Sequence, residues 1–291
     1  MKKKKSIQDF YGMKEKGEQI TFITSYDYPT ATFAERAGMD MILVGDSLGM
    51  CVYGYEGTMP VTMDMMIVHS EAVRRGAPNT YVIGDMPFLS YQTSDEAAVE
   101  NAGRFYKEAR VDAIKLEGGV RIQSRIKAIV DAGMLVMGHI GLTPQSSSQL
   151  GGFKAQGRTL NSAKAQVEDA LAVQEAGAAM ILLEAIPPEV AGYIRDTLTI
   201  PILSIGAGPY CDGQLLIVSD MLGVFEAFTP KFVKRYAEVA RICTEGLTSY
   251  VNEVRAKKFP EPKHIYPMIP EELTKFKEWA ETQKSGMKKA R

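Results

Sequence analysis

The chain has 291 residues, of which 45% are hydrophobic and 24% charged, and its formal net charge is −1. This is ordinary globular composition with enough apolar material for a large core, so a disordered or fibrous protein is excluded. The balanced charge argues against a nucleic-acid partner, and no apolar stretch is long enough to span a membrane.

The first expected element is a short amphipathic helix over residues 6–16, with Ser6 as its N-cap and Gly17 as its stop. The lysine-rich residues 1–5 are not followed by the apolar run of a signal peptide, and we expect them to form a solvated tail. An apolar, β-branched run over residues 19–25 predicts the first strand, and a helix should follow it and end at Ala37.

A unit of helix end, tight turn and short apolar strand then recurs along the chain. Gly38, Gly133 and Gly177 are placed to relieve left-handed strain at three of these turns. The expected strands are residues 19–25, 41–44, 81–84, 113–116, 134–137, 180–183, 202–205 and 215–218. Near-continuous apolar strands indicate burial on both faces, and about eight such units favour a closed (β/α)₈ barrel, the TIM barrel.

The chain shows no linker between two cores, so we expect one domain over residues 1–291. Residues 230–257 predict a long closing helix, whereas the connection from 205 to 215 is too short for a full helix. The N-terminal helix within residues 1–18 and the C-terminal helical extension, residues 258–291, are expected to be peripheral. The three cysteines, Cys51, Cys211 and Cys243, lack metal-type spacing and suit a cytoplasmic location.

Acidic residues stand where several of the predicted strands end. In a barrel of this kind the active site lies at the carboxyl ends of the strands, so these side chains should converge on one mouth. The acids are Asp46, Asp85, Glu117 and Glu184, and Lys115 and His139 accompany them. Lys115 and Glu117 are two residues apart on one strand and therefore point to the same side, while Leu116 should face the helices.

One acid at a strand end is most often a helix cap or a salt-bridge partner. Four together in a low-dielectric mouth repel one another, and a cation is expected among them. Oxygen ligands favour a hard ion such as Mg²⁺. Lys115 is either a counter-ion to Glu117 or a ligand for a substrate carboxylate, and His139 is as consistent with a buried structural histidine as with a catalytic one.

Several motifs resemble the ketopantoate hydroxymethyltransferase family, and they occur in family order. They lie at residues 44–50, 60–62, 84–88, 115–119, 138–146, 151–158, 183–187 and 205–208, with 211–214. Together they are far more specific than any one of them. The N-terminal helix and the segment after Lys257 carry little of the resemblance.

The resemblance implies a barrel enzyme that binds Mg²⁺ and transfers a hydroxymethyl group from 5,10-methylenetetrahydrofolate to 3-methyl-2-oxobutanoate. The product would be 2-dehydropantoate (ketopantoate), in pantothenate and coenzyme A biosynthesis. By motif match the metal ligands are Asp46, Asp85 and Glu117, the substrate contacts are Asp46, Ser47, Asp85 and Lys115, and the base is Glu184. His139 is expected to support these residues, and the family assembles as a large homo-oligomer, typically a homodecamer.

The main rival is an enzyme related to phosphoenolpyruvate mutase or isocitrate lyase, because those barrels also use Mg²⁺ to stabilise the enolate of an oxo acid. Such enzymes usually carry a reactive cysteine in a lid. The comparable loop here, residues 154–157, has no cysteine, so the hydroxymethyltransferase is the favoured interpretation. Its Gln145 to Arg158 segment is polar and glycine-rich, as expected of a lid or folate-side loop.

Overall fold

A computed structural model describes residues 3–289 of the chain, with side chains described to residue 283. The structure splits into two compact units, with the boundary between Glu238 and Val239. The first unit contains all eight strands, and the second contains only helices and connecting segments. The prediction of a single domain over residues 1–291 stays a prediction.

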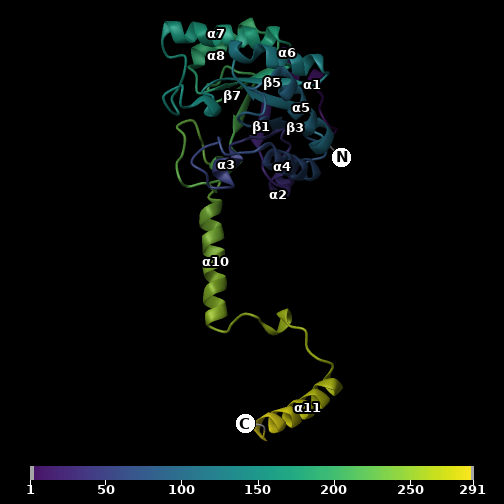
Figure 1. Ribbon diagram of the computed structural model, residues 1–291. Coiled ribbons are helices and arrows are strands. Elements are labelled where there is room, and N and C mark those ends of the chain that lie inside the picture. Colours follow the sequence, from purple (N-terminus) through teal and green to yellow (C-terminus); the bar gives the residue numbers. More distant parts are fainter. Residues whose placement is uncertain (1–2, 290–291) are drawn as a thin grey trace. The chain divides into compact units, whose positions relative to one another are not determined.

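Eight parallel strands close into a barrel in sequence order, with β1 beside β8, and helices lie outside them (Figure 1). The strands are β1 (Ile20–Thr24), β2 (Met41–Val44), β3 (Tyr81–Asp85), β4 (Ala113–Glu117), β5 (Val136–Gly141), β6 (Met180–Glu184), β7 (Ile202–Ile205) and β8 (Gly213–Leu216). The predicted (β/α)₈ barrel is confirmed.

Most strands are followed by a helix, but β7 runs to β8 through a short segment that contains none, as its length predicted. The helices of the first unit are α1 (Ile7–Lys16), α2 (Tyr28–Ala37), α3 (Leu48–Cys51), α4 (Met63–Gly76), α5 (Asp95–Arg104), α6 (Gln123–Asp131), α7 (Leu160–Glu175), α8 (Pro188–Thr197) and α9 (Val218–Met221), with the π-helix η1 (Phe105–Ala109) and the 3-10 turns η2 (Val120–Ile122) and η3 (Pro144–Ser146). The second unit has α10 (Val239–Arg255), η4 (Pro262–His264) and α11 (Pro270–Lys289). None of the described helices is long and apolar enough to cross a membrane.

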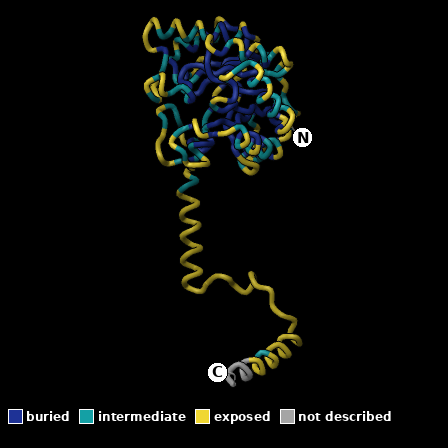
Figure 2. The backbone as a smooth tube through the Cα atoms, in the orientation of Figure 1, coloured by how far each residue is buried: buried dark blue, intermediate teal, exposed yellow. Residues whose placement is uncertain are grey.

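Alternation along the strands divides the core into two layers. Side chains such as Phe22, Leu43 and Leu203 fill the barrel interior, whereas Ile114 and Leu116 pack under the surrounding helices. The prediction that Leu116 faces the helix layer is therefore confirmed. Figure 2 shows this buried core as the dark blue interior of the barrel unit.

The amino-terminal ends of the strands form the bottom of the barrel, and helix α1 contributes to its core. Phe10 is fully buried and meets the ring of Tyr81 edge-on, with 5.2 Å between the ring centroids. Lys4 and Lys5 form ion pairs with Asp112 and Asp40. The expectation of a solvated tail is wrong for these two lysines, because part-buried acids at the bottom of the barrel need cationic partners.

The predicted left-handed turns are confirmed: Gly38, Gly133 and Gly177 have φ values of 88°, 87° and 93°. Arg110 occupies the corresponding turn before β4 and has a φ of 54°, a conformation in which a side chain is strained.

The predicted helix over residues 230–257 is wrong in its first part, because α10 begins at Val239. The preceding residues take up other contacts: the ring of Phe232 lies where a side chain on Gly206 would be, and the Tyr236 amide donates to the Met221 carbonyl. Strand β5 also begins two residues later than predicted and reaches Gly141, which places His139 within the strand.

Candidate active site

The four strand-end acids converge at the carboxyl ends of the strands, as the sequence predicts. Asp85, Glu117 and Glu184 are the last residues of β3, β4 and β6, and Asp46 lies just beyond β2. Asp46, Asp85 and Glu117 are buried, whereas the Glu184 side chain is 14% exposed. Glu184 is therefore the acid of this group most open to a molecule entering the mouth.

Lys115 lies between two of the acids. Its ammonium donates to Asp85 Oδ1 at 2.6 Å and lies 3.5 Å from Glu117 Oε1, and all three side chains are almost fully buried. The backbone amide of Asp46 donates to the other oxygen of Asp85, Oδ2, at 3.1 Å. Lys115 thus serves as counter-ion to both acids, which is the first of the two roles considered for it.

His139 links Glu117 to Glu184 across the mouth. Its Nδ1 lies 3.4 Å from Glu117 Oε1 and its Nε2 lies 3.1 Å from Glu184 Oε2, although neither contact has hydrogen-bond geometry. Burial and Lys115 lower the pKa of His139, but the two carboxylates outweigh them and raise it to about 9. The two carboxylates therefore favour the protonated, positively charged form of the ring.

Gln145 and Tyr91 complete the network, and neither was singled out as a site residue from the sequence. The Gln145 side-chain amide donates to Asp46 Oδ2 and to the Met86 carbonyl, both at 2.9 Å, and its backbone N–H donates to Glu117 Oε2 at 2.9 Å. Tyr91 donates its hydroxyl to Gln145 Oε1 at 2.8 Å. The signals for Gln145 were its place in the motif at residues 138–146 and at the start of the polar 145–158 segment; Tyr91 had none.

Ser47 lies beside Asp46 but is bonded to a different element. Its hydroxyl is 2.8 Å from the hydroxyl of Tyr26, which in turn accepts a hydrogen bond from Thr24 Oγ1 at 3.0 Å. These two partners come from the end of β1 and the residues after it. Ser47 therefore joins the wall of the mouth between β1 and β2 rather than the acid cluster itself.

The position of Glu184 depends on a glycine in the neighbouring strand. Gly141 pairs with Glu184 in the β5–β6 register and has a φ of 94°. A Cβ on Gly141 would lie 2.2 Å from the Glu184 carbonyl oxygen, which the following Leu142 amide needs as its acceptor. Only glycine permits this approach of the two strands.

The cluster has more acid than base. Burial raises the pKa of Asp46 well above its usual range, and the negative charges of Asp85 and Glu117 add to the effect. Burial likewise raises the pKa of Asp85, against the opposing charge of Lys115. The pKa of Glu117 is lowered, because Lys115 and His139 outweigh the effect of burial. A further cation beside Asp46 and Asp85 would relieve the excess negative charge.

Among the described residues, no three His, Cys, Asp or Glu side chains are arranged to enclose a metal ion. Mg²⁺ does not need such a cage, because it usually retains several waters and takes one or two carboxylates. Asp46 and Asp85 fit this requirement through their oxygen donors, their contact and their raised pKa values. Glu117 is already engaged by Lys115 and Gln145, which leaves it suited to contact through water.

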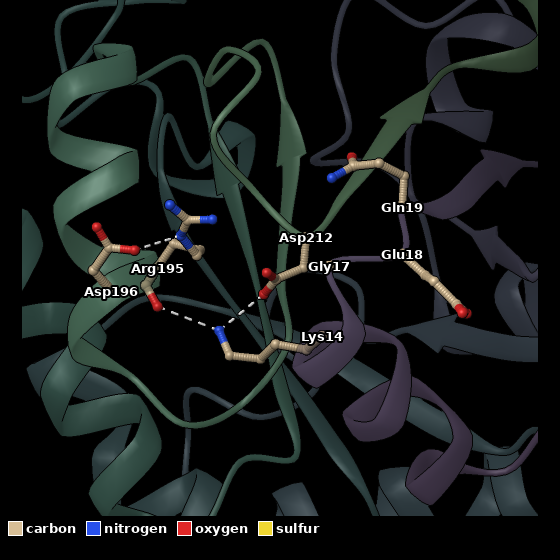
Figure 3. Close-up of a pocket in the computed structure, with 7 residues that line it drawn as sticks. All are labelled: Lys14, Gly17, Glu18, Gln19, Arg195, Asp196 and Asp212. Atoms are coloured by element: carbon tan, nitrogen blue, oxygen red, sulfur yellow. Dashed lines mark hydrogen bonds and ion pairs between the residues drawn. The ribbon is translucent and has the colours of Figure 1, made fainter.

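The barrel unit has a cavity at each end. One of about 280 Å³ adjoins the acid cluster and includes Glu117 and Gln145 in its wall. The other, of about 290 Å³, lies at the bottom among Lys14, Arg195 and Asp212 (Figure 3). In the bottom cavity Lys14 donates to Asp212 at 2.9 Å and to the Arg195 carbonyl at 3.3 Å, and none of the predicted site residues lines it.

Solved structures with a similar fold support the barrel assignment. A phosphonopyruvate hydrolase, solved in complex with oxalate and Mg²⁺, aligns with a TM-score of 0.59 and 15% identity, covering 98% of this chain and 96% of that one. A 2,3-dimethylmalate lyase of the phosphoenolpyruvate mutase/isocitrate lyase superfamily aligns with a TM-score of 0.54 and 18% identity, covering 97% and 98%. At this identity the likeness shows the fold alone.

Relatives found by sequence comparison are much more similar to this chain than these solved structures are. The family model described as ketopantoate hydroxymethyltransferase matches residues 4–262. The 3-methyl-2-oxobutanoate hydroxymethyltransferase of Alkaliphilus metalliredigens is 65% identical over 269 residues, which cover 92% of this chain and 95% of the relative. That of Moorella thermoacetica is 52% identical over 261 residues, covering 90% and 97%. The chain therefore belongs to the ketopantoate hydroxymethyltransferase family.

Proposed function

We propose that the mouth of the barrel transfers a hydroxymethyl group from 5,10-methylenetetrahydrofolate to 3-methyl-2-oxobutanoate, giving ketopantoate in pantothenate biosynthesis. The activity is that of the curated relatives, which are 3-methyl-2-oxobutanoate hydroxymethyltransferases. The observation that carries the proposal is the continuous network of Glu184, His139, Glu117, Lys115, Asp85 and Asp46 at the strand ends. It combines a cation site, a fixed positive charge and a separate, more open carboxylate.

Asp46 and Asp85 would hold Mg²⁺ directly, with Glu117 acting through water. When bound, Mg²⁺ would withdraw electron density from the keto group of the oxo acid and so acidify the neighbouring C–H. Lys115, whose ammonium is held between Asp85 and Glu117, would bind the substrate carboxylate. Ser47 would donate from the β1–β2 side of the mouth.

Glu184 would remove the proton from the carbon next to the ketone, and the resulting enolate carbon would attack the methylene carbon of the folate. Water then replaces the remaining bond from this carbon to the folate nitrogen, which supplies the hydroxyl group and releases tetrahydrofolate. A positioned carboxylate contributes roughly 10²–10⁴ in rate to the proton removal. Glu184 Oε2 lies 3.1 Å from His139 Nε2, and glycine at position 141 permits the close approach of the neighbouring strand. His139 acts here as a positioning residue between two acids.

Turnover of the purified protein tests the reaction. With 3-methyl-2-oxobutanoate, 5,10-methylenetetrahydrofolate and Mg²⁺ it should form ketopantoate, and a chelator should abolish the activity until Mg²⁺ is restored. Absence of product with fresh metal and donor would refute the proposed reaction.

Proton exchange isolates the role of Glu184. Without folate, the protein should exchange the C3 proton of the oxo acid into D₂O, and Glu184→Gln should slow this by roughly 10²-fold or more while oxo-acid binding is retained. Glu189→Gln is a matched control, because Glu189 is exposed on α8 nearby in the sequence. Exchange at the wild-type rate in Glu184→Gln would remove Glu184 as the base.

The proposed assembly is a homo-oligomer, with the decamer of the family as the expected size. Helix α10 supports self-association, because nothing within the second unit buries its apolar residues Ile242, Leu247, Tyr250 and Val251. Exposed apolar surface of this kind usually marks an interface. The proposed location is the cytoplasm, where the free thiols of the three cysteines would remain reduced. The absence of a nucleic-acid partner stays a prediction.

A further inference from the structure

The cavity beside the acid cluster shares part of its wall with the network of the mouth. Its volume is about 280 Å³, and Glu117 and Gln145 are shared between its wall and the network of the mouth. Pockets for whole drug-sized ligands measure about 300–1,000 Å³, so this one fits part of such a molecule. A ligand in it would lie directly against the place where the oxo acid is activated.

The walls of the cavity suit a flat, polar ring. Met59, Phe88 and Ile122 give apolar contact surface, and the side-chain amides of Gln92 and Gln149 supply donors and acceptors. Apolar walls with a few placed polar groups are typical of sites for small organic ligands. The reduced pterin of a folate has this chemistry, with ring faces for packing and several edge groups for hydrogen bonds.

Two arginines line the same cavity, and they differ in their partners. Arg125 is paired with Asp95. Arg121 instead donates to two neutral groups of the following loop, Ser146 Oγ at 2.5 Å and Gln149 Oε1 at 3.1 Å. Within the described part of the chain, no carboxylate lies within ion-pair distance of Arg121, and the residue is exposed. It is therefore free to bind an anion at the edge of the cavity.

We propose that this cavity is the donor subsite, with the reduced pterin ring packed against Phe88 and Ile122 and the glutamate tail of the folate bound by Arg121. The inference rests on the proposed function and adds to it the residues that hold the second substrate. The ring side of the donor carries the one-carbon unit, and placing it beside Glu117 brings that carbon to the acid cluster. The tail leaves the cavity toward solvent past Arg121.

Two donors that differ only in the tail test this arrangement: 5,10-methylenetetrahydrofolate and 5,10-methylenetetrahydropteroate, which lacks the glutamate. Arg121→Ala should raise KM for the folate roughly 10-fold, the usual effect of losing a charged hydrogen bond. It should leave KM for the pteroate, KM for the oxo acid and the folate-independent proton exchange unchanged. Phe88→Ala should weaken both donors alike, because both contain the ring.

Arg195→Ala is the matched control, since Arg195 lines the similarly sized cavity at the other end of the barrel. It should leave both donors unaffected. An unchanged KM for the folate in Arg121→Ala, or an equal rise for both donors, would overturn the assignment of the tail to Arg121.

Calorimetric binding of tetrahydrofolate, measured on the same variants, separates this inference from the reaction. If wild-type protein binds tetrahydrofolate and Arg121→Ala weakens that binding, the subsite stands even where turnover fails. If turnover and proton exchange are intact but Arg121→Ala and Phe88→Ala both bind tetrahydrofolate as wild type does, the subsite is wrong while the proposed function survives.

Discussion

Both ends of the barrel hold buried or part-buried acids, but only at the bottom does each acid have its own cationic partner. At the bottom, Asp40, Asp112 and Asp212 precede β2, β4 and β8, and each pairs with a lysine of the N-terminal segment. Each also accepts a backbone N–H from the strand before it in the barrel, given by Thr21, Val82 and Ile202. At the mouth, four acids share Lys115 and His139.

The electrostatic consequence appears in two acids that differ by six positions. Burial raises the pKa of Asp40, but hydrogen bonds from Lys5 and Thr21 outweigh it and the pKa is lowered. Burial and the neighbouring carboxylates raise the pKa of Asp46. Burial therefore raises the pKa of an acid only where no counter-charge outweighs it, which is the case at Asp46 and not at Asp40.

The largest expected effect is on activity, in Asp46→Asn. Removing one charge from an over-acidic cluster should leave the folded protein at least as stable as wild type, because like-charge repulsion falls. Loss of a proposed metal ligand should nevertheless lower kcat/KM by at least roughly 100-fold. Steady-state kinetics and thermal unfolding in parallel check this. Strong destabilisation of Asp46→Asn would show that the mouth is charge-balanced after all.

The mirror experiment is Asp212→Asn at the bottom. It removes the negative charge that the mostly buried Lys14 pairs with, and removing one partner of a buried pair costs roughly 3 kcal/mol. The free energy of unfolding in urea should fall by about this amount, while KM for the oxo acid stays unchanged. The double variant Lys14→Met, Asp212→Asn should recover part of the loss. A catalytic defect without loss of stability in Asp212→Asn would contradict the claim that the acids at the bottom stabilise the fold and those at the mouth serve the reaction.

A smaller effect should appear in the pH dependence of stability. Because the pKa of Asp40 is lower in the folded protein, its contribution is complete above the unfolded pKa near 4 and is lost as the pH falls through the folded value. In Asp40→Asn, the free energy of unfolding should fall by about 1 kcal/mol less on acidification than it does in wild type. The effect is this small because Lys5 is partly exposed. Unfolding curves between about pH 2 and 6 test this. An unchanged acid limb would show that the Lys5–Asp40 pair adds nothing.

The barrel and the acids of the mouth were predictable because both depend on local patterns. Apolar runs predict strands, and each acid lies at the carboxyl end of such a run. The carboxyl ends of parallel strands meet at the same end of the barrel. The contacts of Gln145 were not predictable, since its partner Asp46 lies 99 residues away along the chain. The prediction of a solvated tail failed at Lys4 and Lys5 for the same reason, because Asp112, the partner of Lys4, lies 108 residues away.

The prediction of a helix from residue 230 was also wrong because of contacts with residues distant in the sequence. Residues 230–238 have a helical pattern, but Phe232 and Tyr236 take up contacts with Gly206 and Met221 instead. Tertiary packing decides such short segments, because helix propensity is a weak preference. The sequence pattern of a segment therefore predicts its structure best where its partners are close in the chain.

The most direct test of this account is a calorimetric titration of Mg²⁺ into the protein with 3-methyl-2-oxobutanoate present and folate absent. We expect one site in wild type, the same affinity in Asp212→Asn, and an affinity at least roughly 10-fold weaker in Asp46→Asn. Wild-type affinity in Asp46→Asn would contradict the claim that the unmatched carboxylates of the mouth hold the metal.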